Sequence, residues 1–237
     1  MTERDGPGTS AFPDFSAPSA RQRMNELRIV FDLARAPLST GRLLRAPTGD
    51  DRPVFVLPGL GAADASLAPL RRYLAGRNHD AHGWGLGRNR GDVADTVRRF
   101  LPRLEARVES AGRPANLVGW SLGGVVARAA TRERPDLVHR VATFGTPLFG
   151  PRGSVTARAF DAKQIEHIES LIAKRAGTPV PRPVMVIHSK HDGIVDWRAC
   201  VDEQTPFALN VEVTATHFGM GVSPDVMLHL ARWFAPE

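Results

Sequence analysis

The sequence is poor in cysteine and lysine and has no long apolar run. Cys200 is the single cysteine among 237 residues, so the chain can form no internal disulfide and no cysteine metal knuckle, and nothing in it requires an oxidising compartment. No uninterrupted apolar stretch approaches the roughly 20 residues that span a bilayer. Residues 1–20 carry acids and prolines and lack the features of a secretory signal. These absences predict a soluble, cytoplasmic protein without stable membrane insertion.

Positive charge comes almost entirely from arginine. Lysine and arginine together number 31 against 25 acidic residues, a net charge of +6, yet only three of the 31 are lysines. A basic surface attracts polyanions, so charge alone allows a nucleic acid or an anionic membrane as partner. The arginines are scattered among acids with no long basic run. That pattern favours a solvated, arginine-rich surface and predicts no nucleic-acid partner.

The chain is long enough, at 42% hydrophobic residues, to bury one substantial core. We expect a single domain over residues 21–237 after a disordered tail at 1–20, whose composition cannot offset its own ordering entropy. Residues 23–36 predict a helix with an apolar face made of Met24, Leu27, Val30, Phe31 and Ala34. That face could lie on a membrane, but packing on the domain is the favoured interpretation.

Strands and helices alternate along the rest of the chain. Runs rich in valine, isoleucine and leucine predict strands at residues 53–57, 79–84, 115–118, 138–144, 183–188 and 210–214. Apolar stripes predict helices at residues 67–76, 92–111, 122–134 and 224–234. Asp92 is the expected N-cap of the second helix, and Gly112 its stop. The alternation predicts an α/β fold with a mostly parallel sheet and helices on both faces.

The sharpest local signal is a Gly-x-Ser-x-Gly pattern between a predicted strand and a predicted helix. The residues are Gly119-Trp120-Ser121-Leu122-Gly123-Gly124. A strand that turns abruptly into a helix holds the serine in a strained conformation and presents its hydroxyl at the positive end of that helix. The flanking glycines remove Cβ atoms that would clash across the turn. In this context Ser121 is a predicted nucleophile, although an ordinary glycine-rich turn has the same letters.

A serine nucleophile needs a base within reach and a third group to orient that base. The loop after strand 183–188 carries two carboxylates, Asp192 and Asp196. Asp192 precedes Gly193, which suits a tight turn that exposes the acid, whereas Asp196 can cap the helix that begins beside it. We therefore assign the orienting acid to Asp192.

The expected base is His217, the last histidine before the terminal helix, in a loop of small residues that follows a strand. The other histidines lie in helices, begin a strand, precede the serine or flank the acid; they are His229, His167, His139, His79, His82, His188 and His191. The string from His188 to Asp192 can also suggest a metal site. It lacks further ligands at suitable spacing, so no metal and no cofactor is predicted.

Attack on a carbonyl also requires two donors for the oxyanion that forms. The backbone N–H of Leu122, directly after the nucleophile, is one candidate. The other is the N–H of Leu60, in the loop Pro58-Gly59-Leu60-Gly61 after the first strand, where two glycines let the backbone come close. The alternative is that this loop is merely a turn.

Together these residues resemble the bacterial esterase and lipase branch of the α/β-hydrolase superfamily, over nearly everything from Pro53 to Phe234. Four motifs in order carry the resemblance: Pro58-Gly-Leu-Gly61, Gly119 to Gly123, Ser189-Lys-His-Asp192-Gly-Ile-Val195 and His217-Phe-Gly-Met-Gly221. The resemblance implies a triad of Ser121, Asp192 and His217, with the amides of Leu60 and Leu122 as oxyanion hole. The chain departs from this branch at Pro58 and Trp120, where histidine is common. Its tryptophan elbow is also similar to that of esterases acting on acyl-carrier-protein methyl esters.

Residues 148–182 form an insertion in which Ile165, Ile168, Leu171 and Ile172 line one face of an expected helix. Within the superfamily such insertions act as caps over the active site, although an ordinary packed helix has the same pattern. The sequence therefore predicts a serine hydrolase that cleaves a small-molecule or lipid carboxylic ester through an acyl-enzyme. A thioesterase or acyltransferase with the same triad is the near alternative. A non-catalytic binding protein is disfavoured because no member of the triad is missing.

Overall fold

The computed structural model describes residues 15–30, 39–150, 153–159 and 178–236. At its centre is a six-stranded sheet in the order β2-β1-β3-β4-β5-β6, and each neighbouring pair of strands is parallel. The strands are β1 (Pro53–Leu57), β2 (Asp80–Gly83), β3 (Ala115–Trp120), β4 (Val138–Phe144), β5 (Val184–His188) and β6 (Leu209–Glu212). The predicted parallel sheet is confirmed, with strand limits close to those expected.

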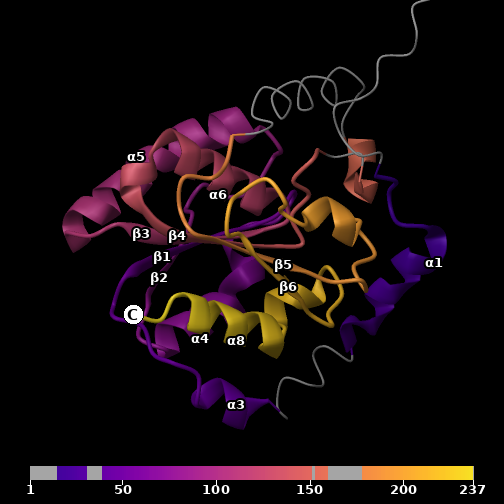
Figure 1. Cartoon of the computed structure of the whole chain (residues 1–237), viewed down its shortest axis with the longest axis horizontal. Helices are drawn as coiled ribbons and strands as arrows, with labels where there is room; N and C mark the ends of the chain where they lie inside the picture. The colour runs from indigo at the N-terminus through magenta and orange to yellow at the C-terminus, as the bar shows by residue number, and fades with distance from the viewer. Residues whose placement is uncertain (1–14, 31–38, 151–152, 160–177, 237) are drawn as a thin grey trace, which may run out of the picture.

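Two layers of helices cover this sheet (Figure 1). Helices α4 (Ala68–Gly76) and α8 (Pro224–Trp233) lie on one face, and α5 (Val93–Ala111) and α6 (Leu122–Glu133) lie on the other. In β1, Val54 and Val56 pack in the core beneath α4 and α8, whereas Phe55 and Leu57 pack beneath α5 and α6. A strand that is buried on both faces needs an apolar side chain at every position, which explains the continuous apolar runs of the sequence.

The ends of α5 follow the expected capping pattern. The Asp92 carboxylate accepts a hydrogen bond from the backbone N–H of Asp95 at 2.9 Å, and Gly112 ends the helix with a φ of 64°. Shorter helices join the main elements: α1 (Ala20–Arg23), η1 (Met24–Arg28), α3 (Thr40–Leu44), η2 (Asp64–Leu67), η3 (Pro135–Leu137), η5 (Val155–Ala159), η6 (Trp197–Cys200) and η7 (Gly219–Val222).

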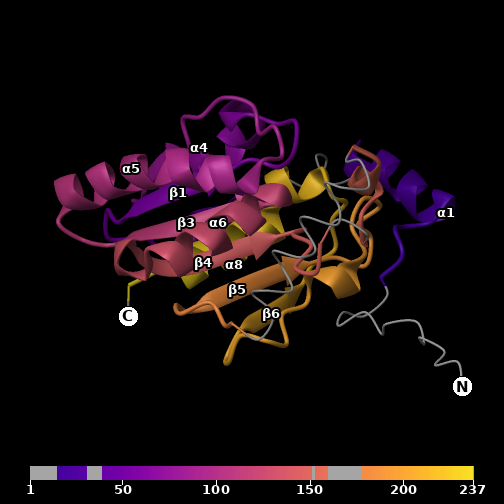
Figure 2. The same cartoon turned by 90° about the horizontal axis from the view of Figure 1, so that it is seen from above.

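Parallel pairing brings the carboxyl ends of the strands to one end of the sheet, where open α/β sheets bind their ligands. The loops after β1, β3, β5 and β6, which carry the candidate residues, all leave from this end. Helices α1 and η1 also lie at this end of the molecule, far from the C-terminus (Figure 2). The N-terminal segment is thus a neighbour of the candidate site despite its distance in sequence.

This N-terminal helical segment begins earlier than expected. It starts at Ala20, behind a capping box in which Ser19 and Gln22 each accept a hydrogen bond from the backbone N–H of the other. Ser19 lies within the segment expected to be disordered, and Gln22 lies just beyond its expected end at residue 20. Of that expected tail, residues 15–20 are described, and the Phe15 ring packs against Phe149 with 5.3 Å between centroids.

The apolar face expected of this helix points outward. Met24, Leu27 and Val30 are 68%, 73% and 66% exposed, so their expected packing on the domain is wrong. The row on the opposite side of the segment makes the contact with the domain, and in it Glu26 accepts a hydrogen bond from the backbone N–H of His217. Arg23, Glu26 and Ile29 of that row are half-buried, so Met24, Leu27 and Val30 face away from the domain.

Other expectations lie outside the described residues. They are the remainder of the tail at 1–14, Phe31 and Ala34 of the N-terminal helix, and the apolar helix face of Ile165, Ile168, Leu171 and Ile172 within the insertion at 148–182. Within the described ranges, no helix has both the length and the apolar character needed to cross a membrane.

Candidate active site

Ser121 occupies a strained turn between β3 and α6. Its φ of 53° and ψ of −125° place it in the left-handed half of conformational space, which costs a non-glycine residue of order 1–3 kcal/mol. The neighbouring glycines are required by close packing. A Cβ on Gly119 would lie 2.3 Å from the Gly124 Cα, and a Cβ on Gly123 would lie 2.3 Å from the Leu57 carbonyl oxygen. The expected strand-turn-helix geometry around Ser121 is therefore present.

The end of β4 holds this turn in place. The Ser121 N–H donates to the Phe144 carbonyl at 2.9 Å, and the Thr146 hydroxyl donates to the Ser121 carbonyl at 3.0 Å. Between these two anchors lies Gly145, with a φ of 57°. A Cβ on Gly145 would sit 3.1 Å from the ring of His217, so the serine turn and the imidazole share this neighbour.

Asp192 and His217 form a buried hydrogen-bonded pair. His217 Nδ1 lies 2.7 Å from Asp192 Oδ2, and their side chains are 3% and 1% exposed. The other carboxylate oxygen, Oδ1, accepts hydrogen bonds from the backbone N–H groups of Ile194 and Val195, each at 2.8 Å. A carboxylate can only accept a hydrogen bond, so the tautomer that fits this contact has its proton on Nδ1. In a neutral imidazole of that tautomer, Nε2 is the acceptor nitrogen.

The two carboxylates of the acid loop have separate positions. Asp196 caps η6, because its side chain accepts a hydrogen bond from the Arg198 N–H at 3.0 Å. Asp192 makes the contact with His217. The structure also gives a different reason for Gly193 than a turn that exposes the acid. The Asp192 side chain is only 1% exposed, and a Cβ on Gly193 would meet the Gln22 carbonyl oxygen at 2.6 Å.

Four other described histidines have surroundings of their own. His188 stacks on Trp197 with 5.7 Å between ring centroids, and burial lowers its pKa. His82 pairs with Asp80 at 2.8 Å, and burial lowers the pKa of His229 on α8 and of His79. Among the described residues, no three His, Cys, Asp or Glu side chains are grouped so that they could hold a metal ion.

The loop after β1 lies directly against the nucleophile turn. A Cβ on Gly59 would be 3.1 Å from the Cβ of Ser121, so the backbone of Gly59, the residue before Leu60, lies against the serine. Asn89, which is buried, holds this loop in place. Its side-chain NH₂ donates to the Pro58 carbonyl at 2.9 Å, and its main-chain carbonyl accepts from the Gly61 N–H at 2.8 Å. Leu60 N–H donates to no atom in the described part of the chain.

Leu122 is the first residue of α6. The N–H groups of a first helical turn have no acceptor within the helix, so this amide is available at the positive end of the helix dipole. Leu122 thus directly follows Ser121 at the start of α6, and Leu60 directly follows the glycine whose backbone lies against Ser121.

Aromatic side chains surround the imidazole. The Trp120 ring lies 5.4 Å from the His217 ring, and Phe218 lies 6.1 Å from Trp120 and 5.7 Å from His217, centroid to centroid. Trp120 is buried, whereas Phe218 is 50% exposed. Trp120, where the related branch commonly has histidine, therefore packs against the rings of His217 and Phe218.

Cys200 is the other side chain that could act as a nucleophile near this site. It is buried in η6, and burial raises the pKa of its thiol well above the ordinary value. Because the thiolate is the reactive form, a buried thiol with a raised pKa is a poor nucleophile.

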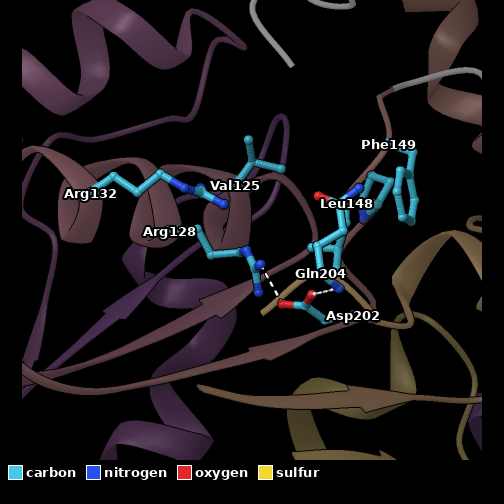
Figure 3. Close-up of a pocket in the computed structure, with 8 residues that line it drawn as sticks. Val125, Arg128, Arg132, Leu148, Phe149, Asp202 and Gln204 are labelled. Atoms are coloured by element: carbon cyan, nitrogen blue, oxygen red, sulfur yellow. Dashed lines mark hydrogen bonds and ion pairs between the residues drawn. The ribbon is translucent and has the colours of Figure 1, made fainter. Parts of the chain in front are cut away.

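A cavity of about 60 Å³ lies between α6 and the loop after β4 (Figure 3). It is lined by Val125, Arg128, Arg132, Pro147, Leu148, Phe149, Asp202 and Gln204. Arg128 pairs with Asp202 at 2.5 Å, and both side chains are buried. Ligand pockets commonly measure several hundred Å³, and none of Ser121, Asp192 and His217 lines this one. The cavity is too small for an ester substrate, so we do not place the substrate there.

Three residues that hold the site were missed by sequence reasoning: Asn89 behind the β1 loop, Thr146 behind the serine turn, and Glu26 in η1. Thr146 follows the carboxyl end of a predicted strand, which is a usable signal. Asn89 and Glu26 act across long stretches of sequence, and no local pattern connects them to the site.

Comparison with known proteins gives a structural likeness only. No family model matches the chain, and no curated protein sequence matches it. A lipase of Bacillus licheniformis superposes with a TM-score of 0.60 at 16% identity, over 78% of this chain and 92% of the lipase. A monoacylglycerol lipase of Paleococcus ferrophilus gives 0.58 at 17% identity, over 80% and 96%. A thioesterase domain from the curacin biosynthetic pathway gives 0.54 at 12% identity, over 80% and 92%. The chain therefore has the fold of the α/β-hydrolase superfamily.

Proposed function

We propose that this chain is a serine hydrolase that cleaves carboxylic esters through an acyl-enzyme on Ser121. The observation that carries the proposal is the buried hydrogen bond between His217 Nδ1 and Asp192 Oδ2, 2.7 Å long, beside a serine held at a positive φ. Strain of this kind persists only where the surrounding structure enforces it, and it clusters at functional sites. A buried imidazole with one nitrogen fixed by a carboxylate has its other nitrogen ready to accept a proton.

In the proposed reaction, His217 Nε2 removes the proton of the Ser121 hydroxyl as its oxygen attacks the ester carbonyl carbon. The imidazolium that forms is stabilised by Asp192, whose Oδ1 stays bonded to two backbone N–H groups. Collapse of the tetrahedral intermediate breaks the bond to the alcohol, and the imidazolium returns its proton to that leaving oxygen. Water, which gives a proton to the same nitrogen, then attacks the acyl carbon; the bond to the Ser121 oxygen breaks, that oxygen takes the proton back from the imidazolium, and the acid is released.

The negative charge on the carbonyl oxygen needs preorganised donors, which typically contribute about 3–4 kcal/mol each to the transition state. We assign them to the amides of Leu60 and Leu122. This assignment is supported by the close approach of the Gly59 backbone to Ser121 and by the position of Leu122 at the start of α6. The hydrogen bonds from Asn89 to the β1 loop keep one donor in position before substrate arrives.

An ester panel tests the proposal. Hydrolysis of p-nitrophenyl esters from short to long acyl chains should be measured with the wild type and with Ser121→Ala as the blank. We expect turnover that disappears in Ser121→Ala while the fold, monitored by circular dichroism, is kept. Absence of turnover on every ester, or equal turnover by the two proteins, would contradict the proposal.

A thioesterase is the second candidate, because the fold is shared with a thioesterase domain at a TM-score of 0.54. The same nucleophile, base and donors serve either substrate, so the fold cannot choose between them. An oxygen ester and a thioester with the same acyl group should be compared by kcat/KM. Adding an alcohol or thiol acceptor and measuring the partition between free acid and transfer product tests acyl transfer in the same experiment.

A further inference from the structure

The carboxylate of Glu26 joins the two loops that carry the acid and the base. Oε1 accepts a hydrogen bond from the backbone N–H of Gly193 at 2.8 Å and another from that of His217 at 2.9 Å. Oε2 accepts a third from the N–H of Phe218 at 3.2 Å. Hydrogen bonds to an ionised acceptor are about twice as strong as neutral ones. One side chain from the N-terminal segment therefore hydrogen-bonds both to His217, the proposed base, and to Gly193, the residue directly after the proposed acid.

The packing of the helix on the acid loop is an independent observation. Gly193 lies so close to this segment that a Cβ would meet the Gln22 carbonyl oxygen at 2.6 Å, the Arg23 Cα at 3.0 Å and the Glu26 Cγ at 3.1 Å. The helix is thus seated on the backbone next to Asp192. A larger residue at position 193 would push the helix away and lengthen the bonds to the Glu26 carboxylate.

We propose that Glu26 is a positioning residue of the active site, which sets the separation of the acid and base loops and so the geometry of the His217–Asp192 hydrogen bond. This inference rests on the proposed function for its kinetic consequence, but its structural part stands without it. Glu26 touches neither the serine nor the proposed substrate position in any contact described above. Its effect passes through the backbone of His217, and a misplacement of about 1 Å can cost up to about 100-fold in rate.

The kinetic test compares substitutions in this segment. Glu26→Ala removes all three acceptor contacts and should lower kcat for the p-nitrophenyl esters by about 10- to 100-fold, with KM changed by less than about threefold. Glu26→Gln keeps an amide oxygen for Gly193 and His217 and should retain more activity than Glu26→Ala. The matched control is Ser19→Ala, which removes the N-cap of α1, the helix directly before η1, but leaves the Glu26 carboxylate, and it should stay within about threefold of wild type.

A spectroscopic test does not depend on turnover. The proton on His217 Nδ1, in a short hydrogen bond to a carboxylate, should give a low-field proton resonance that is absent in Asp192→Asn. Glu26→Ala should shift or broaden this resonance, and Ser19→Ala should leave it in place. If Glu26→Ala does not fold, the comparison of Glu26→Gln with wild type provides the same test through a smaller shift.

Each result has a distinct meaning. Wild-type kinetics and an unmoved resonance in Glu26→Ala would overturn the positioning role, as would an equal loss of activity in Ser19→Ala. A wild-type protein that hydrolyses no ester would instead count against the proposed function, and the resonance would then decide the role of Glu26 alone.

Discussion

The substitution Asp192→Asn should abolish most activity because the structure fixes how the new amide must lie. Oδ1 of Asp192 accepts from the N–H groups of Ile194 and Val195, so an asparagine keeps its oxygen there and turns its NH₂ toward His217. Nδ1 of His217 must then accept a hydrogen bond, at the position where the distance is now 2.7 Å. The ring takes the other tautomer, with the proton on Nε2, and cannot remove a proton from serine.

The expected loss is about 10⁴-fold in kcat, or about 5 kcal/mol of transition-state stabilisation. Asp196→Asn is the matched control, four residues along the same loop. Asparagine caps a helix about as well as aspartate, and the ion pair lost with the largely exposed Arg198 is weak, so stability should change by less than about 1 kcal/mol and kcat by less than about threefold. Both variants should be assayed on one p-nitrophenyl ester and unfolded in urea. A large loss in Asp196→Asn with normal activity in Asp192→Asn would refute the reasoning.

Three further predictions concern the framework around the site. Gly119→Ala should destabilise the fold by about 1–3 kcal/mol or more, since its Cβ would lie 2.3 Å from the backbone of Gly124. The control Gly41→Ala, whose Cβ would have no atom within 4 Å, should be neutral or stabilising. Equal urea midpoints for the two variants would contradict the packing argument. Arg128→Met should cost about 3–5 kcal/mol at neutral pH, because it leaves Asp202 buried and unpaired. Burial raises the pKa of Asp202, but the charge and hydrogen bond of Arg128 lower it by more, so the pKa lies below its ordinary value of 3.8. The contribution of the pair to stability is therefore complete above pH 3.8 and is lost as pH falls through the lowered pKa. A stability penalty of Arg128→Met that does not shrink in acid would contradict this. Burial lowers the pKa of His79 below 6.5, so the contribution of the neutral ring to stability is complete above pH 6.5 and is lost as pH falls through the lowered pKa. His79→Leu should reduce the dependence of the unfolding free energy on pH below 6.5. An unchanged pH dependence would contradict this prediction.

Local pattern predicted most of the fold correctly. The continuous apolar runs of β1 and β5 are buried on both faces, and the caps of α5 stand at Asp92 and Gly112. The loops that carry Ser121, Asp192 and His217 could be placed at one end of the sheet because parallel strands all end there. These features depend on residues near each other in sequence or on the rules of sheet topology.

Contacts between distant segments could not be predicted in this way. The outward direction of Met24, Leu27 and Val30 follows from the contacts of Glu26, whose carboxylate accepts hydrogen bonds from the domain on the opposite side of the segment. The bond between Glu26 and His217 joins residues 191 positions apart. Helical periodicity indicates which residues share a face. It does not indicate which of two faces meets the domain when the less apolar face carries a carboxylate, here Glu26, that hydrogen-bonds to backbone groups of the domain.

The central claim, that Ser121 is an activated nucleophile, is tested most directly by labelling with a fluorophosphonate probe, which reacts with serine only where a base and an oxyanion hole assist. Intact-mass measurement and peptide mapping should find one probe on Ser121 of the wild type and none on Ser121→Ala. A folded wild-type protein that stays unlabelled, or a Ser121→Ala variant that is labelled to the same extent, would contradict the account.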